Sequence, residues 1–464
     1  MPAEKCAYAL ARYSRSADSI RQSLEWVRGH DSHKFLESFY FQYGHASIAD
    51  LGHVALCFEG ISELAATEIE DEQLWDGQAR SSRYQDFSKS GMVTPPELSG
   101  EAARAYHWAG ERLLAVYGQV HQAVFEHLAA KLPRPGDMKV EAYERNRAAR
   151  AFDVARYLLF LGVPTSVGQV TSIRTLERQV RRLKASEYRE LNEVGDEMAA
   201  ACAEVPGCAL DESIPLEPIA PTLAKYVSAD AYLQRTREDL RQWAAQNLPP
   251  AARPEVPDVD LLKPPSPVPD IVATLLYPVT DRPYRELYGL AEGWSEAVRR
   301  EVLDLAVRWR GRGDDLLRAF RGGPYVFDII MDAGAWRDLH RHRRCHQFRQ
   351  AYTTGLGYET PAAISEAGVA ALYDSAMQSA IGALGTLPEP AAHYLIPFAA
   401  KSRFLFKMDF AEAEYIARLR SGLKGHFSYR GVAWKMKEAM DRVEPELGRL
   451  IQATPPWMED PLRR

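Results

Sequence analysis

Two stretches of equal length decide how the fold of this chain is interpreted. Residues 157–183, "YLLFLGVPTSVGQVTSIRTLERQVRRL", align without a gap on residues 394–420, "YLIPFAAKSRFLFKMDFAEAEYIARLR". Each stretch begins with aliphatic residues, continues through a polar middle and ends with basic residues. Because one pattern that occurs twice indicates an internal repeat, we expect a duplicated fold.

The composition of the whole chain is that of a globular protein. It has 464 residues, of which 46% are apolar and 26% charged, and its formal net charge is −6. This length predicts more than one domain, and the mild acidity predicts no general attraction to nucleic acid or to an anionic membrane. The five cysteines are scattered, which is typical of a reducing compartment. The N-terminus lacks the apolar core of a signal peptide, and no run approaches the ~20 apolar residues of a membrane span, so we expect a cytoplasmic protein.

One segment differs from the rest in composition. Residues 249–269 hold eight of the 29 prolines. Because proline fixes φ and removes a backbone donor, this segment is expected to be an extended linker. The sequence therefore predicts a first domain over residues 1–248, a Pro-rich linker over 249–270 and a second domain over 271–464.

Helices are expected to dominate both domains. Apolar residues recur at three- and four-residue spacing over residues 47–76 and 295–322, which predicts helices there. The clearest strand candidate is "PYVFDIIMD", residues 324–332. We therefore expect an α+β fold that is rich in helices and has a small antiparallel sheet in each domain.

The most unusual feature is a basic stretch, residues 338–355, "DLHRHRRCHQFRQAYTTG". From Arg337 to Arg349 there are five arginines, three histidines and one cysteine, with Asp338 as the single acid. A metal site, a nucleic-acid surface, a phosphate pocket, and a charged face paired with acids of a neighbouring element are four possible explanations. His342 and His346 are four residues apart, as ligands on a helix can be, but the neighbouring arginines would repel a dication and no second ligand pair is evident. We expect no metal site.

Nucleic-acid binding is also disfavoured, because the cluster is short, the chain is acidic and no known DNA- or RNA-binding module occurs. A phosphate pocket suits guanidinium groups well, since their fork of donors matches phosphate oxygens.

The basic stretch resembles the signature of the flavin-dependent thymidylate synthases, the ThyX family, which has R-H-R followed after seven residues by S-x-R-Y. Arg341, His342 and Arg343 match the R-H-R, whereas alanine and threonines stand at the later positions, residues 351, 353 and 354. The first domain shows the reverse. Its R-H-R positions, residues 71–73, are Asp-Glu-Gln, but Ser81, Arg83 and Tyr84 match the S-x-R-Y in register.

The downstream arginines of the family are divided in the same way. Arg156 and Arg174 match in the first domain, and Arg420 matches in the second. The family's lead-in resembles residues 43–62, where His45 is expected to be structural. The resemblance therefore covers most of both domains, as a tandem duplication with degenerate motifs in each half.

What the resemblance implies is a site shared between the two halves. It assigns Arg341, His342, Arg343 and Arg174 to FAD, and Ser81, Arg83, Arg156 and Arg420 to a nucleotide substrate such as dUMP. It identifies no catalytic side chain, because the flavin supplies the hydride. Members of the family are homotetramers, so a duplicated chain is expected to form a homodimer that imitates the tetramer.

The implied function is a FAD-dependent, thymidylate synthase-like transfer of a one-carbon unit to a pyrimidine nucleotide, or reduction of such an acceptor. Reduced folate and NADPH are possible co-substrates. The carboxylates of residues 71 and 72 are expected to repel a flavin diphosphate from the first half's copy of the R-H-R site. A non-catalytic nucleotide-binding or structural relative of the same fold is the alternative.

Overall fold

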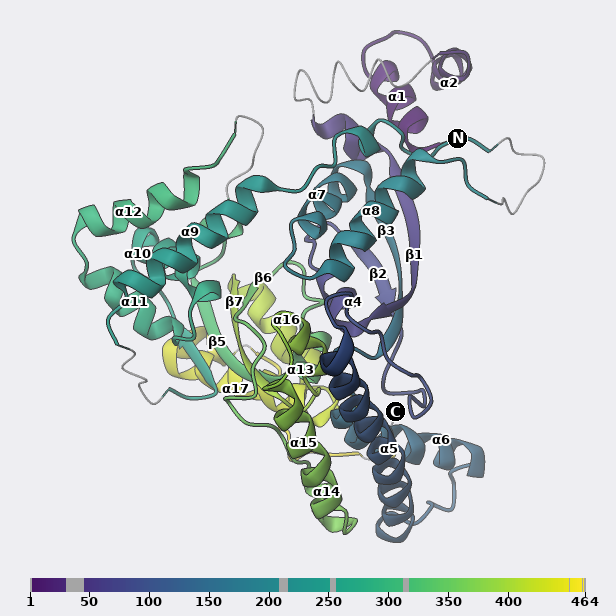
Figure 1. Ribbon diagram of the computed structural model, residues 1–464, viewed down its shortest axis with the longest axis vertical. Coiled ribbons are helices and arrows are strands. Elements are labelled where there is room, and N and C mark those ends of the chain that lie inside the picture. Colours follow the sequence, from purple (N-terminus) through teal and green to yellow (C-terminus); the bar gives the residue numbers. More distant parts are fainter. Residues whose placement is uncertain are drawn as a thin grey trace.

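The computed structural model describes residues 2–30, 46–207, 216–250, 256–311, 317–449, 451–460 and 462. His45, which was expected to be structural, lies outside the described residues. Two small antiparallel sheets are surrounded by helices, which confirms the α+β expectation (Figure 1). No helix in the described ranges is long and apolar enough to cross a membrane.

The first sheet has the strand order β1-β3-β2, and its strands are His53–Ser62, Pro164–Ser172 and Asp76–Ala79. The helices of this half are α1 (Ala3–Tyr13), α2 (Ile20–Arg28), α4 (Glu63–Ile69), α5 (Gly100–Lys131), α6 (Val140–Ala155), α7 (Ile173–Lys184), α8 (Arg189–Ala203) and α9 (Ala231–Asn247). Short 3-10 helices cover Ala46–Leu51, Arg156–Leu158 and Leu223–Lys225.

The second sheet has the order β4-β5-β7-β6, and its strands are Val259–Leu262, Tyr325–Asp332, Lys401–Met408 and His346–Arg349. Its helices are α10 (Pro267–Leu276), α11 (Tyr284–Gly293), α12 (Glu296–Val307), α13 (Ala333–Leu339), α14 (Ala362–Glu366), α15 (Ala370–Leu384), α16 (Phe410–Arg420), α17 (Phe427–Val443) and α18 (Pro445–Gly448). Further 3-10 helices cover Tyr277–Val279, Arg318–Phe320 and Ala391–Leu395.

The same unit occurs in both halves. In each, a strand leads into a short helix and a second strand, and a later strand pairs between them and leads into another helix. The helix that follows each of the two longer strands is capped by a polar side chain at the same place. Ser62 and Asp332 cap α4 and α13, and Ser172 and Asp409 cap α7 and α16. The alignment of residues 157–183 on 394–420 therefore places β3 and α7 on β7 and α16.

Three predictions of local structure need correction. Residues 53–62, which were predicted to be helical, form β1, because their side chains alternate between buried and exposed over most of the segment and pair with β3. The helix expected over residues 295–322 ends at Val307, and the segment from 312 to 316 lies outside the described residues. The Pro-rich segment is not a simple linker, because Val259–Leu262 pairs with β5 as an edge strand and Pro267 begins α10.

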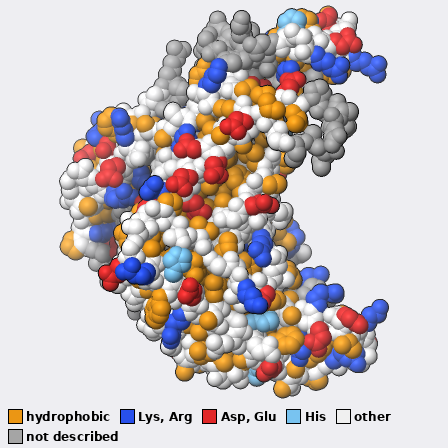
Figure 2. Space-filling model, turned by 45° about the vertical axis from the view of Figure 1, so that its right-hand side comes forward, with side chains coloured by type: hydrophobic (Ala, Val, Ile, Leu, Met, Phe, Trp, Pro, Cys, Tyr) orange, Lys and Arg blue, Asp and Glu red, His pale blue; other side chains and the backbone are white. Residues whose placement is uncertain are grey.

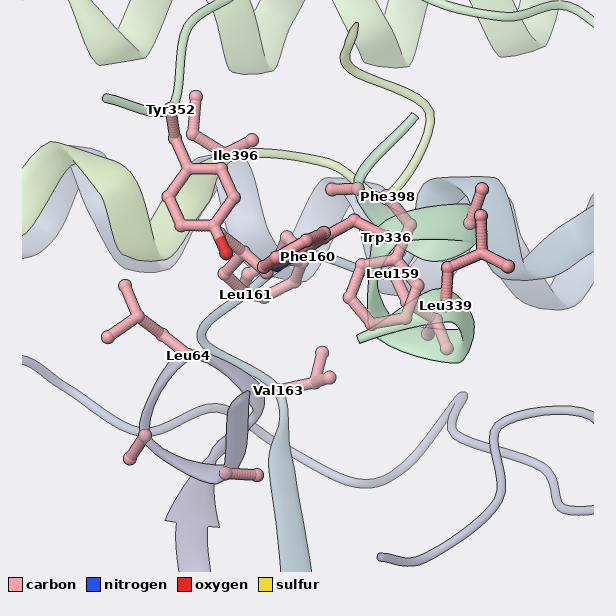
Figure 3. Close-up of a cluster of buried hydrophobic side chains, with 14 of the residues drawn as sticks. Leu64, Leu159, Phe160, Leu161, Val163, Trp336, Leu339, Tyr352, Ile396 and Phe398 are labelled. Atoms are coloured by element: carbon pink, nitrogen blue, oxygen red, sulfur yellow. The ribbon is translucent and has the colours of Figure 1, made fainter. Parts of the chain in front are cut away.

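The two halves share one hydrophobic core (Figure 3). Leu159 and Phe160 of the first half pack in it with Trp336 and Phe398 of the second. Between them the backbones of residues 157–162 and 394–399 pair in antiparallel fashion, with a bridge between Phe160 and Pro397. Because residues 160 and 397 hold equivalent positions in the aligned stretches, this pairing relates the halves by an approximate two-fold axis.

Candidate functional site

The two-fold axis places two related sites between the halves. One gathers the positions at which the family motif is kept: residue 341 of the second half with residues 81, 83 and 156 of the first. The other gathers the counterparts at which the motif is lost: residue 71 of the first half with residues 351, 353 and 393 of the second. We call these the arginine cluster and the large cavity.

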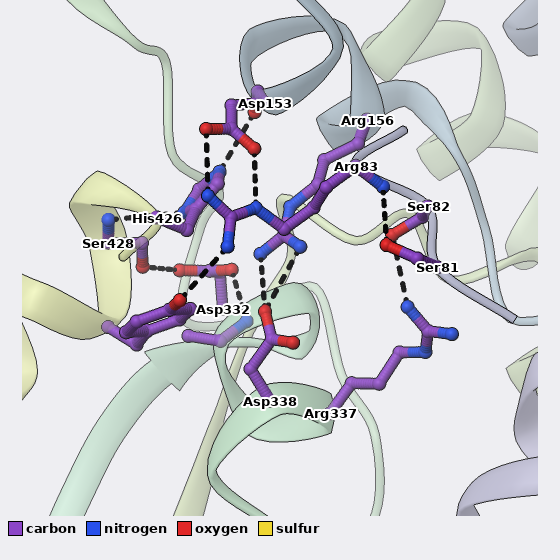
Figure 4. Close-up of polar contacts among 12 residues, drawn as sticks. Ser81, Ser82, Arg83, Asp153, Arg156, Asp332, Arg337, Asp338, His426 and Ser428 are labelled. Carbon is purple, nitrogen blue, oxygen red and sulfur yellow. Dashed lines mark hydrogen bonds and ion pairs between the residues drawn. The ribbon is translucent and has the colours of Figure 1, made fainter. Parts of the chain in front are cut away.

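The arginine cluster brings together side chains that are far apart in the sequence (Figure 4). Arg156, at the end of α6, is fully buried, and both of its terminal nitrogens donate to Asp338 Oδ2 at 3.0 Å. Arg83 donates to both carboxylate oxygens of Asp153 at 2.7 and 3.2 Å. Arg337 pairs with Glu63 at 2.5 Å. Three guanidinium groups of this cluster are thus already held by carboxylates of the chain itself.

Asp338 lies at the electrostatic centre of the cluster. Burial raises its pKa, but the guanidinium groups of Arg156, Arg337, Arg83 and Arg341 outweigh this effect and lower the pKa to about 2. Arg341 Nε is buried and makes no hydrogen bond within the described part of the chain. The Asp338 carboxylate therefore compensates part of the positive charge of these four guanidinium groups.

Two serines border the same cluster. Ser81 Oγ accepts a hydrogen bond from the backbone N–H of Arg83, and Ser82 Oγ accepts one from Arg337 at 3.0 Å. Arg83 and Arg156 of the first half thus act on the Asp338 carboxylate together with Arg341 of the second half. Ser81 is joined to this group through the backbone N–H of Arg83.

The remaining R-H-R residues, His342 and Arg343, make ion pairs and hydrogen bonds with other side chains of this chain. His342 Nδ1 lies 3.3 Å from Glu412, and its Nε2 accepts from Arg420 at 2.7 Å. Arg343 pairs with Asp76 of the first half at 2.9 Å. The space beside these residues is only about 10 Å³.

Acids of the first half explain why so much positive charge is tolerated in the basic stretch. Asp71 pairs with Arg318 at 2.7 Å and lies 3.7 Å from His340. Glu68 pairs with Arg349 at 2.7 Å. The acidic residues at the first half's R-H-R positions and just before them thus complement the basic residues of the second half. This arrangement matches the fourth explanation for the basic stretch, a charged face paired with acids of a neighbouring element.

The large cavity has a volume of about 1870 Å³. Its inner wall holds the aromatic side chains of Trp336, Tyr352 and His393 together with Arg349. The Arg349 guanidinium lies 4.3 Å from the centre of the Tyr352 ring, a cation–π distance. The lining thus combines aromatic side chains with an arginine that Glu68 compensates.

His393 is the counterpart of Arg156 and is 5% exposed. Its Nδ1 lies 2.8 Å from the Tyr188 hydroxyl, whereas its Nε2 has no partner within the described residues. Burial, followed by the nearby Arg349 charge, lowers the pKa of His393 to about 4, so the ring is neutral near pH 7. The Nε2 atom is itself buried, so the ring is held by its Nδ1 contact and by packing.

The structure separates Arg174 from the other residues that the resemblance assigned to FAD. Arg174 lines the large cavity and pairs with Asp50 at 3.1 Å, whereas the segment 341–343 belongs to the other site. The carboxylates of Asp71 and Glu72 also line the cavity, but Arg318 and Arg182 compensate them.

Several walls of the cavity have no recognisable signal in the sequence. Trp336, α9 and α10 belong to no motif, whereas Tyr352 lies in the basic stretch and His393 is the counterpart of Arg156. Within the described part of the chain, no group of three or more histidine, cysteine or acidic side chains is placed to hold a metal ion. Lys and Arg side chains alternate with Asp and Glu on the face drawn in Figure 2.

Comparison with other proteins gives the family. UPF0159 proteins of Chlamydia pneumoniae and Chlamydia muridarum are 24% and 25% identical to this chain, over 87% and 88% of its length and 77% and 81% of theirs. A UPF0159 protein of Thermoplasma acidophilum is 24% identical over 96% of this chain and 94% of its own. A flavin-dependent thymidylate synthase ThyX of Helicobacter pylori, solved with FAD and dUMP, is 17% identical with a TM-score of 0.26, over 44% of this chain and 90% of that one.

The model of the thymidylate synthase complementing protein family matches residues 1–206 and 314–446. These two segments make up most of the chain and include both copies of the repeated unit. The chain therefore belongs to the thymidylate synthase complementing protein family.

Proposed function

We propose that this chain is a FAD-dependent, thymidylate synthase-like enzyme that works at the large cavity. In this proposal it transfers a one-carbon unit to a pyrimidine nucleotide such as dUMP, or reduces a related acceptor. The observation that carries the proposal is the cavity of about 1870 Å³ between the halves, which lies where the two-fold axis repeats the family's motif positions.

The R-H-R segment does not fit FAD in its present arrangement. His342 and Arg343 are engaged with protein partners, and the adjoining space of about 10 Å³ is lined by Glu70, Asp71 and Glu72. A diphosphate placed there would meet carboxylates and would have to displace ion pairs.

The large cavity fits a flavin better. Its volume exceeds the roughly 300–1,000 Å³ of ordinary small-molecule sites, so it has room for a cofactor and a nucleotide together. Trp336 and Tyr352 contribute aromatic side chains to its lining, and Arg349, which is paired with Glu68, lies over the Tyr352 ring. A flavin bound there would supply the hydride. The residues of the chain would orient the ring and exclude water.

The first experiment is the visible absorption spectrum of the purified chain, before and after addition of FAD and desalting. The proposal expects a flavin spectrum that is retained after desalting and that shifts when dUMP is added. A colourless chain that retains no FAD would refute the flavoenzyme proposal and leave the non-catalytic alternative. Tests with reduced folate and NADPH follow only if the flavin binds, since both belong to the same proposal.

A second candidate is a nucleotide-phosphate site at the arginine cluster, as the resemblance implied for Ser81, Arg83 and Arg156. The convergence of four guanidinium groups and the unbonded Nε of Arg341 favour it. It requires a phosphate to displace the Asp338 carboxylate. Calorimetric titration with dUMP tests it, because Arg341→Ala would abolish binding at the cluster and leave binding in the large cavity unchanged.

The assembly and the domain limits are also proposals. We propose a cytoplasmic homodimer in which each chain supplies two halves. The second half begins before β4 rather than at residue 271, because Val259–Leu262 pairs with β5. Light scattering on the purified chain would give twice the mass of 52.1 kDa if the dimer forms.

A further inference from the structure

One edge of the first sheet has no neighbouring strand within the described part of the chain. β1, His53–Ser62, lies at this edge, on the outer side of the sheet in Figure 1. Residues 53–61 form backbone hydrogen bonds with β3 and with no other described segment. An edge strand presents a row of unpaired N–H and C=O groups, which is a template for pairing with another strand.

The second half shows what occupies the equivalent edge. There β4 pairs in antiparallel fashion with residues 326–329 of β5, the counterparts of residues 55–58 in the repeat. Val326 is also buried in one cluster with residues of α10, α11 and α12. Its counterpart in the first sheet, Ala55, is exposed. No described segment of the first half supplies either the added strand or the helical cover.

The register identifies which backbone groups of β1 point outward. Hydrogen-bonded and non-hydrogen-bonded pairs alternate along an antiparallel ladder. The N–H of Ile173 donates to the carbonyl of Gly52 at 2.9 Å, so the even-numbered residues of 54–58 are those that hydrogen-bond to β3. The N–H and C=O of the odd-numbered residues of 53–59 therefore face the open edge. In the second half, the N–H of Ile330, the counterpart of residue 59, donates to the carbonyl of Asp258 at 2.7 Å, in agreement with this assignment.

β1 lacks most of the features that keep an edge strand unpaired. Natural edge strands are protected by short length, by lysine or proline, or by a bulge. β1 has ten residues, and its segment 53–58, "HVALCF", contains no proline, lysine, arginine or acidic residue. The shift in register lies between Glu59 and Ile61, toward the end of the strand. The open edge is therefore suited to being covered by a strand in the assembled protein.

We propose that β1 pairs in antiparallel fashion with β1 of a second copy of this chain, so that the two first sheets form one continuous sheet. An antiparallel strand that pairs with itself is related to its mate by a two-fold axis, which closes the assembly at two chains. The open groups of both copies are then satisfied by the same hydrogen bonds. The inference rests on the proposed homodimer and deepens it by naming the surface that forms it.

The outward groups also define the register of this pairing. All those of residues 53–59 find partners when residue 56 lies on the two-fold axis. Ala55 then lies opposite Cys57 of the partner subunit, and His53 lies opposite Glu59 of the partner subunit. Within the described residues, the side chains of His53 and Glu59 make no ion pair or hydrogen bond. The pairing therefore sets a carboxylate against a histidine at each end of the paired segment.

Light scattering on Ala55→Pro tests the pairing. The native chain should have twice the mass of 52.1 kDa. Proline removes an outward N–H that takes no part in the ladder with β3, so the fold should persist while the measured mass falls by half. Ala55→Ser keeps this N–H, so it is the matched control and should remain a dimer. Circular dichroism shows whether both variants are folded.

Cysteine cross-linking tests the register, and it stands even if Ala55→Pro does not fold. The Cα atoms of a hydrogen-bonded antiparallel pair are about 5.5 Å apart, within reach of a disulfide. Mild oxidation of Ala55→Cys should give at least about ten-fold more covalent dimer than oxidation of the native chain, and the added change Cys57→Ala should abolish this gain. Val170→Cys is the matched control, since Val170 is 47% exposed on the same face but lies one strand further from the edge.

Two results overturn the inference alone: a dimeric native chain whose mass is unchanged in folded Ala55→Pro, or cross-linking of Ala55→Cys no stronger than that of Val170→Cys. A monomeric native chain overturns both the inference and the proposed homodimer. Flavin retention, measured on the same samples, decides the flavoenzyme separately. A dimer joined through β1 that retains no flavin would refute the flavoenzyme and support the inference.

Discussion

Asp338→Asn is the substitution that tests the arginine cluster most sharply. It replaces a carboxylate by a neutral side chain of the same shape, in direct contact with the fully buried Arg156. The pKa of Asp338 is lowered from 3.8 to about 2, which corresponds to about 2.5 kcal/mol of stabilisation at neutral pH. Leaving a buried partner charge uncompensated costs about 3–5 kcal/mol in comparable pairs. We therefore expect the free energy of unfolding to fall by about 2–4 kcal/mol.

The same substitution should create an anion site. Without Asp338, the ion pairs that remain for these four guanidinium groups within the described residues would be Arg83–Asp153 and Arg337–Glu63. Urea unfolding of the variant should therefore show recovery of about 2 kcal/mol in saturating inorganic phosphate, compared with chloride at equal ionic strength. The native chain should show little difference between the two salts.

Asp196→Asn is the control for both effects. Asp196 is 67% exposed and pairs with Lys184 on the surface, so its loss should change the free energy of unfolding by less than about 1 kcal/mol. If Asp338→Asn behaves like this control and gains no stability from phosphate, Asp338 does not neutralise the cluster and the electrostatic account of it is wrong.

Three further outcomes follow from the described contacts. Burial raises the pKa of Asp332 to about 6, so its folded pKa lies above its unfolded value and stability is lost as the pH rises. The free energy of unfolding should therefore fall by up to about 3 kcal/mol between pH 4 and 6. Urea titrations at several pH values should show that Asp332→Asn removes this slope. Gly162→Ala should destabilise the chain by about 1–3 kcal/mol, because an added Cβ would lie 2.0 Å from the Tyr106 hydroxyl at the junction of the halves, whereas Gly136→Ala, with no atom within 4 Å, should not. Phe160→Ala should cost about 3–5 kcal/mol and leave a single unfolding transition by circular dichroism, since the halves share one core; two separate transitions would contradict that view.

Much of the fold could be predicted from the sequence. The gapless alignment of residues 157–183 on 394–420 identified the repeat, and "PYVFDIIMD" identified β5, because an apolar run bounded by glycines and an aspartate is typical of a buried strand. Residues 53–62 were misjudged because apolar residues at 54, 58 and 61 fit a helical period as well as an alternating one. Pairing with β3, which only the tertiary structure shows, decides between them.

The site was predicted in part. The family motifs drew attention to Arg83 and Arg156, which act on Asp338 of the other half, while the binding roles that the resemblance assigned to them stay predictions. The motifs could not show that Asp153, Asp338 and Glu63 hold these arginines, because ion pairs between distant segments leave no local pattern in the sequence. The large cavity was missed for a similar reason. Its walls come from six or more separate segments, and one of them lies outside the matched family segments.

The most direct test of the central claim is the number of flavins that the purified chain retains after loading and desalting, measured by absorbance. The large-cavity account predicts about one flavin per chain in the native protein, marked loss in Arg174→Ala, and unchanged retention in Arg341→Ala. Retention of no flavin would contradict it, because the chain would then bind no such cofactor. Loss of flavin in Arg341→Ala with full retention in Arg174→Ala would also contradict it, and would indicate that the cofactor binds at the R-H-R segment.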